Sequence, residues 1–203
     1  MLPGARCDTI PPLESREPTP ERKMAEYREI ISSSEINDRV RELAGEISKD
    51  YERTIPLFIS LLKGAFIFSA DLVRNVSIPH EIDFITLFSY ANGSRRDRDV
   101  KMLNHLRTDL EGRDVILIDE IVDTGHTIAR LIRTIEEQPI SSIRICTLLD
   151  KPSARKAEVP VHYCGFTIPD VFVVGYGLDF MERYRNLPFI AELTSATTAD
   201  PTP

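Results

Sequence analysis

The sequence is poor in cysteine and has no apolar run that approaches the ~20 residues of a membrane span. Its three cysteines, Cys7, Cys146 and Cys164, do not have the spacing of metal ligands, so we expect free thiols, with Cys146 and Cys164 buried or half-buried. An odd number of cysteines without a pattern is typical of a reducing compartment, and the N-terminus lacks the apolar core of a secretory signal. The expected location is therefore cytoplasmic.

Basic residues are also fewer than acidic residues. The chain has 25 Lys and Arg residues against 32 Asp and Glu residues, which gives a net charge of −7. This balance argues against broad binding to nucleic acid or to an anionic membrane surface. Hydrophobic residues make up 42% of the chain and charged residues 28%, a profile typical of globular proteins, and 203 residues are enough for one domain with a core.

Proline is concentrated near the N-terminus. Residues 1–24 contain five of the 14 prolines together with many charges, so we expect a disordered or loosely attached tail. Residues 196–203 have a similar composition and the same expectation. The folded domain is therefore predicted to span residues 25–195.

Within that domain, apolar runs alternate with helical patterns. Helices are predicted over residues 36–47, after a possible cap in 32–34, and over 65–76 and 127–138; strands are predicted over 55–62, 82–88, 115–119, 143–150 and 171–178. Apolar strands separated by helices indicate an α/β fold with a parallel sheet covered on both faces. Ligands of such sheets bind beyond the carboxyl ends of the strands, where we expect Lys63, Asp119, Asp150, Lys151 and Asp179 to gather.

The stretch VILIDEIVDTGHT, residues 115–127, places a turn between a strand and a helix. Asp123-Thr124-Gly125-His126-Thr127 offers free backbone N–H groups, two hydroxyls and a flexible glycine, which together favour phosphate binding. A plain helix cap formed by Asp or Thr is the alternative. The turn is not a P-loop, because the Gly-Lys-Thr spacing is absent.

Two adjacent acids, Asp119 and Glu120, precede this turn. Carboxylates beside a phosphate site would repel an anionic ligand unless a cation lay between them. Mg²⁺ binds carboxylate, water and ligand oxygens, so a metal ion or a set of sugar hydroxyls is the natural partner. A solvated acidic edge of the sheet is the alternative.

Taken together, the strand, the acids and the Asp-Thr-Gly-x-Thr turn resemble the phosphoribosyl pyrophosphate signature of the type I phosphoribosyltransferases. Further segments resemble the hypoxanthine-guanine branch of this family: LLKGAFIFSADLVR its pyrophosphate loop, FSYANG the start of its lid, LLDKPSAR its purine-contacting lysine segment, and IPDVFVVGYGLDFMERYRNLP its base-binding strand and the acidic and arginine positions that follow. The resemblance covers roughly residues 28–193, with all motifs in the family's order.

The resemblance implies a fold, an activity and a cofactor. The fold is a central, mainly parallel sheet flanked by helices, with a small hood and a flexible lid loop. The activity is transfer of the 5-phosphoribosyl group from phosphoribosyl pyrophosphate to N9 of hypoxanthine or guanine, with release of pyrophosphate, in purine salvage. Mg²⁺ is the implied cofactor, and a homo-oligomer, a dimer or a tetramer, is the implied assembly.

The resemblance also implies roles for the residues of the opening stretch. Asp123 would act as general acid/base near purine N7, where it needs to be within hydrogen-bond reach of the ring. Thr124, Gly125, His126 and Thr127 would hold the 5′-phosphate. Asp119 and Glu120 would face the ribose hydroxyls and Mg²⁺, and Asp179 would hold a second metal ion.

The remaining roles concern pyrophosphate and the base. Lys63, Gly64 and Arg185 would bind pyrophosphate, with a non-proline cis peptide at Leu62–Lys63. Lys151 would donate to the purine 6-oxo group, Phe172 would stack on the base, Val173 would contact it through its backbone, and Ser89 and Tyr90 would begin the lid. A donor at the 6-position favours oxopurines over adenine, which would place two donors face to face.

The chain departs from the family pattern in places. The acidic pair is commonly Glu-Asp in the family, but here it is Asp119-Glu120. His126 either contacts phosphate or faces solvent. Arg95, Arg96 and Arg98 replace a Ser/Gly-rich stretch and either form a solvated loop or help the lid close over pyrophosphate. Two other classes remain open: a phosphoribosyl pyrophosphate sensor that binds nucleic acid, and a flavodoxin-like receiver domain.

Overall fold

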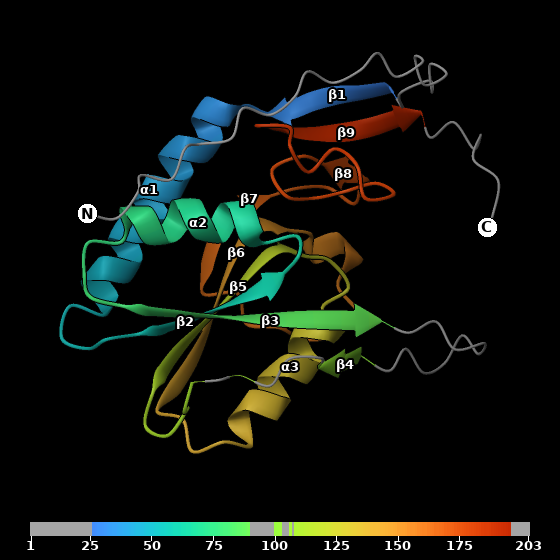
Figure 1. Ribbon diagram of the computed structural model, residues 1–203. Helices are drawn as coiled ribbons and strands as arrows, with labels where there is room; N and C mark the ends of the chain where they lie inside the picture. Colours follow the sequence, from blue (N-terminus) through green and yellow to red (C-terminus); the bar gives the residue numbers. More distant parts are fainter. Residues whose placement is uncertain (1–25, 90–99, 103–105, 107, 196–203) are drawn as a thin grey trace, which may run out of the picture.

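The structure, a computed structural model, describes residues 26–89, 100–102, 106 and 108–195. Its main sheet has six strands in the order β4-β3-β2-β5-β6-β7 (Figure 1). These strands are β2 Leu57–Leu62, β3 Glu81–Ser89, β4 Val100–Met102, β5 Asp114–Val122, β6 Ser142–Asp150 and β7 Tyr163–Thr167. Strands β3, β2, β5, β6 and β7 run parallel to one another, and β4 pairs antiparallel with β3 at one edge of the sheet.

Helices cover both faces of this sheet, as the near-continuous apolar strands predict. Helices α1 (Ser33–Asp50) and α2 (Phe66–Asn75) pack on one face, and α3 (His126–Glu136) packs on the other (Figure 1). Strand β2 shows the alternation that allows this: Phe58 joins the core under α1 and α2, whereas Leu57 and Ile59 join the core under α3. Single-turn helix η1 (Pro152–Ala154) follows β6.

A smaller antiparallel sheet lies on the α1 and α2 side and corresponds to the expected hood (Figure 1). It consists of β1 (Glu26–Ile31), β9 (Ile190–Ser195) and β8 (Val173–Val174), in the order β1-β9-β8. Ile31, Val173 and Ile190 belong to the same core as α1 and α2. The smaller sheet therefore pairs the two ends of the described chain and packs them against the main domain.

The fold class and the three helices are confirmed, but two strand predictions are wrong. The run 171–178 is extended only at Val173–Val174, which belong to the smaller sheet; Gly175 and Gly177, with φ of +98° and +103°, then turn the chain. Strand β5 continues to Val122, so the acids lie within the strand and not at its end. The reason is that β6 continues the pairing, from Asp119 with Thr147 to Val122 with Asp150.

Some expectations fall at or beyond the limits of what the structure describes. Ser89 is the last residue of β3, whereas Tyr90, the three lid arginines, Cys7 and both predicted tails lie outside the described residues. Cys146 is buried and Cys164 half-buried, and both are free thiols, as predicted. Within the described ranges, no helix has the length and apolar character needed to cross a membrane.

Candidate active site

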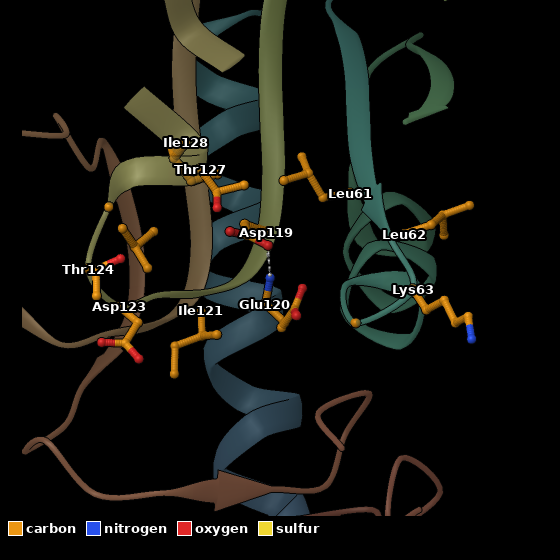
Figure 2. A pocket seen from close by; sticks show the side chains of 13 residues that line it. Leu61, Leu62, Lys63, Asp119, Glu120, Ile121, Asp123, Thr124, Thr127 and Ile128 are labelled. Carbon is orange, nitrogen blue, oxygen red and sulfur yellow. Dashed lines mark hydrogen bonds between the residues drawn. The ribbon is translucent and has the colours of Figure 1, made fainter. Parts of the chain in front are cut away.

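A pocket of about 250 Å³ lies at the carboxyl ends of β2 and β5 (Figure 2). One wall is the end of β2 and the loop that follows it, residues 61–64. The opposite wall is the end of β5, the turn after it and the start of α3, residues 119–125, 127 and 128. The pocket therefore occupies the edge of the parallel sheet where ligands are expected, and it brings Lys63, Asp119, Glu120 and Asp123 together.

The acidic pair forms the deep part of this wall. Asp119 is 8% exposed, and its Oδ1 accepts a hydrogen bond of 3.1 Å from the backbone N–H of Glu120 (Figure 2). Burial raises the pKa of Asp119, and the neighbouring Glu120 carboxyl raises that pKa further. Burial also raises the pKa of Glu120. Burial thus opposes the ionisation of both carboxyls, and a cation beside them would favour the charged form of both.

This donor set fits a metal ion that is shared with a ligand. The described residues contain no group of three or more His, Cys, Asp or Glu side chains that could hold a metal ion on their own. Mg²⁺ usually binds through one or two carboxylates together with water and substrate oxygens. Asp119 and Glu120 could therefore hold a divalent cation with oxygens of a bound phosphate or sugar.

The loop on the other wall approaches the acids closely. The Leu62–Lys63 peptide is cis, as the resemblance predicts. A Cβ on Gly64 would lie 1.8 Å from Oε1 of Glu120, so only glycine fits at this position while the carboxylate keeps its place. Lys63 Nζ lies 3.1 Å from Oε2 of Glu182, a residue for which sequence reasoning predicted no role.

The turn after β5 leads directly into α3. The N-cap of α3 is Gly125, with φ of +81°, and no side chain of the described residues forms a capping hydrogen bond there. The alternative that Asp123 or Thr124 is a helix cap is therefore wrong. Unpaired N–H groups and the dipole at a helix N-terminus favour an anion. Thr127 lines the pocket, whereas His126 is exposed and lies outside the lining.

Lys151 lies beside Asp123 although 28 residues separate them in the chain. Lys151 is only 5% exposed, so it is not a solvated surface lysine. Its Nζ lies 3.8 Å from a carboxylate oxygen of Asp123 and 3.8 Å from one of Asp170, which sequence reasoning missed. Phe172 is 54% exposed and contacts Phe180 edge-on, with ring centroids 5.7 Å apart, and Val173 is buried.

A chain of ion pairs connects the C-terminal segment to the Lys63 loop. Arg185 contacts Asp179 at 2.8 Å and Glu182 at 3.1 Å, and Glu182 also contacts Lys63. Hydrogen bonds from Lys63 and then from Arg185 lower the pKa of Glu182. Asp179 and Arg185 are therefore linked to the pocket through Glu182, although neither residue lines it.

Comparisons with known proteins agree with this arrangement. The family described as phosphoribosyl transferase domain matches residues 27–181. Hypoxanthine-guanine phosphoribosyltransferase of Bacillus subtilis (strain 168) is 46% identical over 167 residues, covering 82% of this chain and 93% of the relative. Hypoxanthine phosphoribosyltransferase of Escherichia coli (strain K12) is 43% identical over 166 residues, covering 81% and 93%.

A solved structure gives the same result. The crystal structure of a hypoxanthine-guanine phosphoribosyltransferase from Bacillus anthracis is 40% identical, with a TM-score of 0.78, and the match covers 83% of this chain and 99% of that chain. The family match spans most of the described domain, and these relatives are aligned over nearly their whole length. The chain belongs to the phosphoribosyltransferase family, in its hypoxanthine-guanine branch.

Proposed function

We propose that this protein is a purine-salvage enzyme that transfers the 5-phosphoribosyl group from phosphoribosyl pyrophosphate to N9 of hypoxanthine or guanine. The products are IMP or GMP and pyrophosphate, and the catalytic domain spans residues 25–195. One observation carries the proposal: a single pocket joins a buried acidic pair to an uncapped helix N-terminus and to Asp123 beside Lys151, in a chain 46% identical to such an enzyme.

At the sugar-phosphate end, the turn of residues 124–127 would hold the 5′-phosphate through its N–H groups and hydroxyls. Asp119 and Glu120 would face the ribose hydroxyls and a divalent cation, which we propose is Mg²⁺. When bound, this ion would neutralise charge on the departing pyrophosphate. The raised pKa of each carboxyl supports the proposal, because a cation would offset the cost of burying the two charges.

At the purine end, Lys151 would donate a hydrogen bond to the 6-oxo group, and Asp123 would hold the N7 proton. The C1′–O bond to pyrophosphate breaks as the N9–C1′ bond forms, and the N7 proton passes to the Asp123 carboxylate. Phe172 would stack on the base, since its ring is more than half exposed, and the backbone of Val173 would contact the base edge.

Pyrophosphate would leave toward Lys63, Gly64 and Arg185. Lys63 and Arg185 both form ion pairs with the carboxylate of Glu182. These ion pairs keep the two positively charged side chains on the same side of the pocket. Asp179 would hold a second metal ion on pyrophosphate. Ser89 and Tyr90 would begin the lid that closes over the site and excludes water.

We further propose a cytoplasmic homo-oligomer, a dimer or a tetramer. The free thiols of Cys146 and Cys164 support a reducing compartment. Large apolar side chains exposed on α2 and β3 support association: Phe66 is 45% exposed, Ile82 38% and Phe84 42%. Size-exclusion chromatography with light scattering would measure the molar mass of the protein in solution. A monomer at micromolar concentration would contradict this part of the proposal.

A base panel tests the proposed activity. Purified protein is given phosphoribosyl pyrophosphate and Mg²⁺ with hypoxanthine, guanine, xanthine or adenine, and nucleotide formation is followed by absorbance. We expect IMP from hypoxanthine and GMP from guanine, and no AMP from adenine. Binding of phosphoribosyl pyrophosphate without turnover of any oxopurine would contradict the proposal and favour the sensor alternative, which a gel shift with nucleic acid would then examine.

A further inference from the structure

The turn of residues 123–127, here called the phosphate turn, is held from behind by residues 151–157, here called the clamp segment. The backbone N–H of Lys151 donates to the carbonyl of Val122 at 3.0 Å. The backbone N–H groups of Lys156 and Ala157 both donate to the carbonyl of Thr124, at 2.9 and 3.0 Å. The carbonyls on either side of Asp123 are thus bound to the segment that follows β6.

Arg155 completes this set of contacts. Its Nε donates to the carbonyl of Asp123 at 3.1 Å, and one terminal nitrogen donates to the carbonyl of Val122 at 3.2 Å. The same nitrogen pairs with the carboxylate of Asp150, and both side chains are only 16% exposed. A guanidinium offers five donors in a rigid plane, so one side chain can bind two carbonyls and a carboxylate together.

These contacts determine where the turn's N–H groups point. Within a planar trans peptide the C=O and the N–H lie on opposite sides, so fixing the carbonyls of residues 122–124 also fixes the N–H groups of residues 123–125. Asp123, Thr124 and Gly125 line the pocket, whereas Arg155 is not among the lining residues. With these carbonyls held toward the clamp segment, the N–H groups are directed to the ligand side.

The packing leaves little freedom for the turn to rotate. A Cβ on Gly125 would lie 2.8 Å from Cδ of Arg155 and 2.8 Å from the carbonyl oxygen of Ala157. The phosphate turn and the clamp segment are therefore in direct contact at the N-cap of α3. Because the ion pair with Asp150 also anchors Arg155 at the end of β6, the guanidinium cannot leave the carbonyls without losing that pair.

We propose that Arg155 is a positioning residue for the 5′-phosphate site: it holds the carbonyls of Val122 and Asp123, so that the N–H groups of Asp123 and Thr124 face the phosphate. The identity of the ligand rests on the proposed function, but the arrangement of the turn does not. A structural role alone is the competing account. It would lower the stability of the whole domain without selecting one end of the substrate.

The test separates the two ends of phosphoribosyl pyrophosphate. Arg155→Met keeps the apolar stem and removes the donors, and Arg155→Lys keeps the charge and removes the planar fork. Arg133→Met, at an exposed position in the last turn of α3, is the matched control. Calorimetric titration gives the affinity of each protein for ribose 5-phosphate and, separately, for pyrophosphate with Mg²⁺.

We expect Arg155→Met to weaken ribose 5-phosphate binding by about 10- to 100-fold, as the loss of hydrogen bonds from a charged donor implies. Arg155→Lys should lie between this variant and the wild type. Pyrophosphate binding, on the Lys63 side of the pocket, should stay unchanged in both variants, and Arg133→Met should match the wild type for both ligands. Equal weakening of both ligands, or unchanged ribose 5-phosphate binding, would overturn the inference.

Turnover of the wild type separates this inference from the proposed function. If the wild type binds ribose 5-phosphate, the Arg155 variants lose that binding and no base is turned over, the proposed enzyme is wrong and the role of Arg155 stands. If the wild type forms IMP and Arg155→Met keeps its KM for phosphoribosyl pyrophosphate, only the role of Arg155 is wrong. Failure of the wild type to bind ribose 5-phosphate would overturn both.

Discussion

Replacing Gly177 by alanine should destabilise the protein and disturb the pyrophosphate side of the site. Gly177 has φ of +103°, and a Cβ there would lie 2.0 Å from the carbonyl oxygen of Gly64. The Gly177 carbonyl also accepts a hydrogen bond of 2.8 Å from Arg185, and its N–H donates to the carbonyl of the same residue at 3.0 Å. The alanine methyl would thus push against the backbone of Gly64 and displace Arg185, two residues that we propose bind pyrophosphate.

The magnitude follows from two costs. An L-residue at this positive φ costs about 1–3 kcal/mol. Moving the Gly64 carbonyl back by roughly 1 Å or more in a packed region costs a further 1–3 kcal/mol, as overpacking does elsewhere. The free energy of unfolding should therefore fall by about 2–6 kcal/mol. This lowers Tm by about 4–24 °C in a domain of this size, at about 2–4 °C per kcal/mol.

Gly64→Ala is the informative comparison with Gly177→Ala. Its new Cβ would collide with a side chain, whereas the new Cβ at residue 177 would collide with backbone. The atom in the way is Oε1 of Glu120, at 1.8 Å, and a carboxylate can rotate away. We expect Gly64→Ala to lose less than about 1.5 kcal/mol of stability but to raise KM for phosphoribosyl pyrophosphate. Scanning calorimetry and urea titration give the stabilities. A Gly177→Ala protein whose Tm lies within 2 °C of the wild type, or a larger loss of stability in Gly64→Ala, would contradict this expectation.

Two further substitutions concern the charged groups. Because the folded-state pKa of Asp119 is raised, the stability it contributes is present below its unfolded pKa and is lost as the pH rises through the folded-state pKa. Metal-free Asp119→Asn should therefore melt above the wild type at neutral pH, with a difference that shrinks on acidification, and a lower Tm at every pH would contradict this. Lys151→Met should raise KM for hypoxanthine by about 10- to 100-fold with little change in KM for phosphoribosyl pyrophosphate. The control Lys49→Met, at an exposed position on α1, should match the wild type. Equal effects of Lys151→Met on both substrates would count against a base-specific role.

The helices and the central strands could be predicted because their signals are local. Helix α1 begins at a capping box in which Ser32 and Glu35 bind each other's backbone, and its buried residues recur at helical spacing. Strands β2, β5 and β6 are mainly apolar, and each is buried on both faces along a run of five residues. Because ligands of a parallel sheet bind beyond the carboxyl ends of its strands, the position of the site at that edge was predictable as well.

The smaller sheet could not be predicted in the same way. Strands β1 and β9 pair with each other across almost the whole length of the chain, from Glu26 with Ser195 to Ile31 with Ile190. No local sequence pattern identifies a strand's pairing partner at such a distance along the chain. The apolar run 171–178 looks like a buried strand, but its two glycines allow positive φ and end the extended segment after Val174.

Within the site, the sequence pattern did not identify the residues that act through the backbone or through other side chains. Arg155 binds carbonyl oxygens, which every residue has, so the sequence does not show its partners. Asp170 and Glu182 became relevant only when the fold placed them beside Lys151 and Lys63. Asp123 and the turn after it were predictable, because strand, acid, hydroxyl and glycine follow one another in the chain.

In the proposed reaction, the carboxylate of Asp123 takes the purine N7 proton during phosphoribosyl transfer at this pocket. The most direct measurement is kcat for IMP formation from hypoxanthine by the wild type and by Asp123→Asn, with the affinity for phosphoribosyl pyrophosphate measured on both proteins. The account predicts turnover by the wild type and a loss of kcat of about 100-fold or more in the variant, with phosphoribosyl pyrophosphate affinity retained. Equal kcat values in the two proteins, or no IMP formed by the wild type, would contradict it.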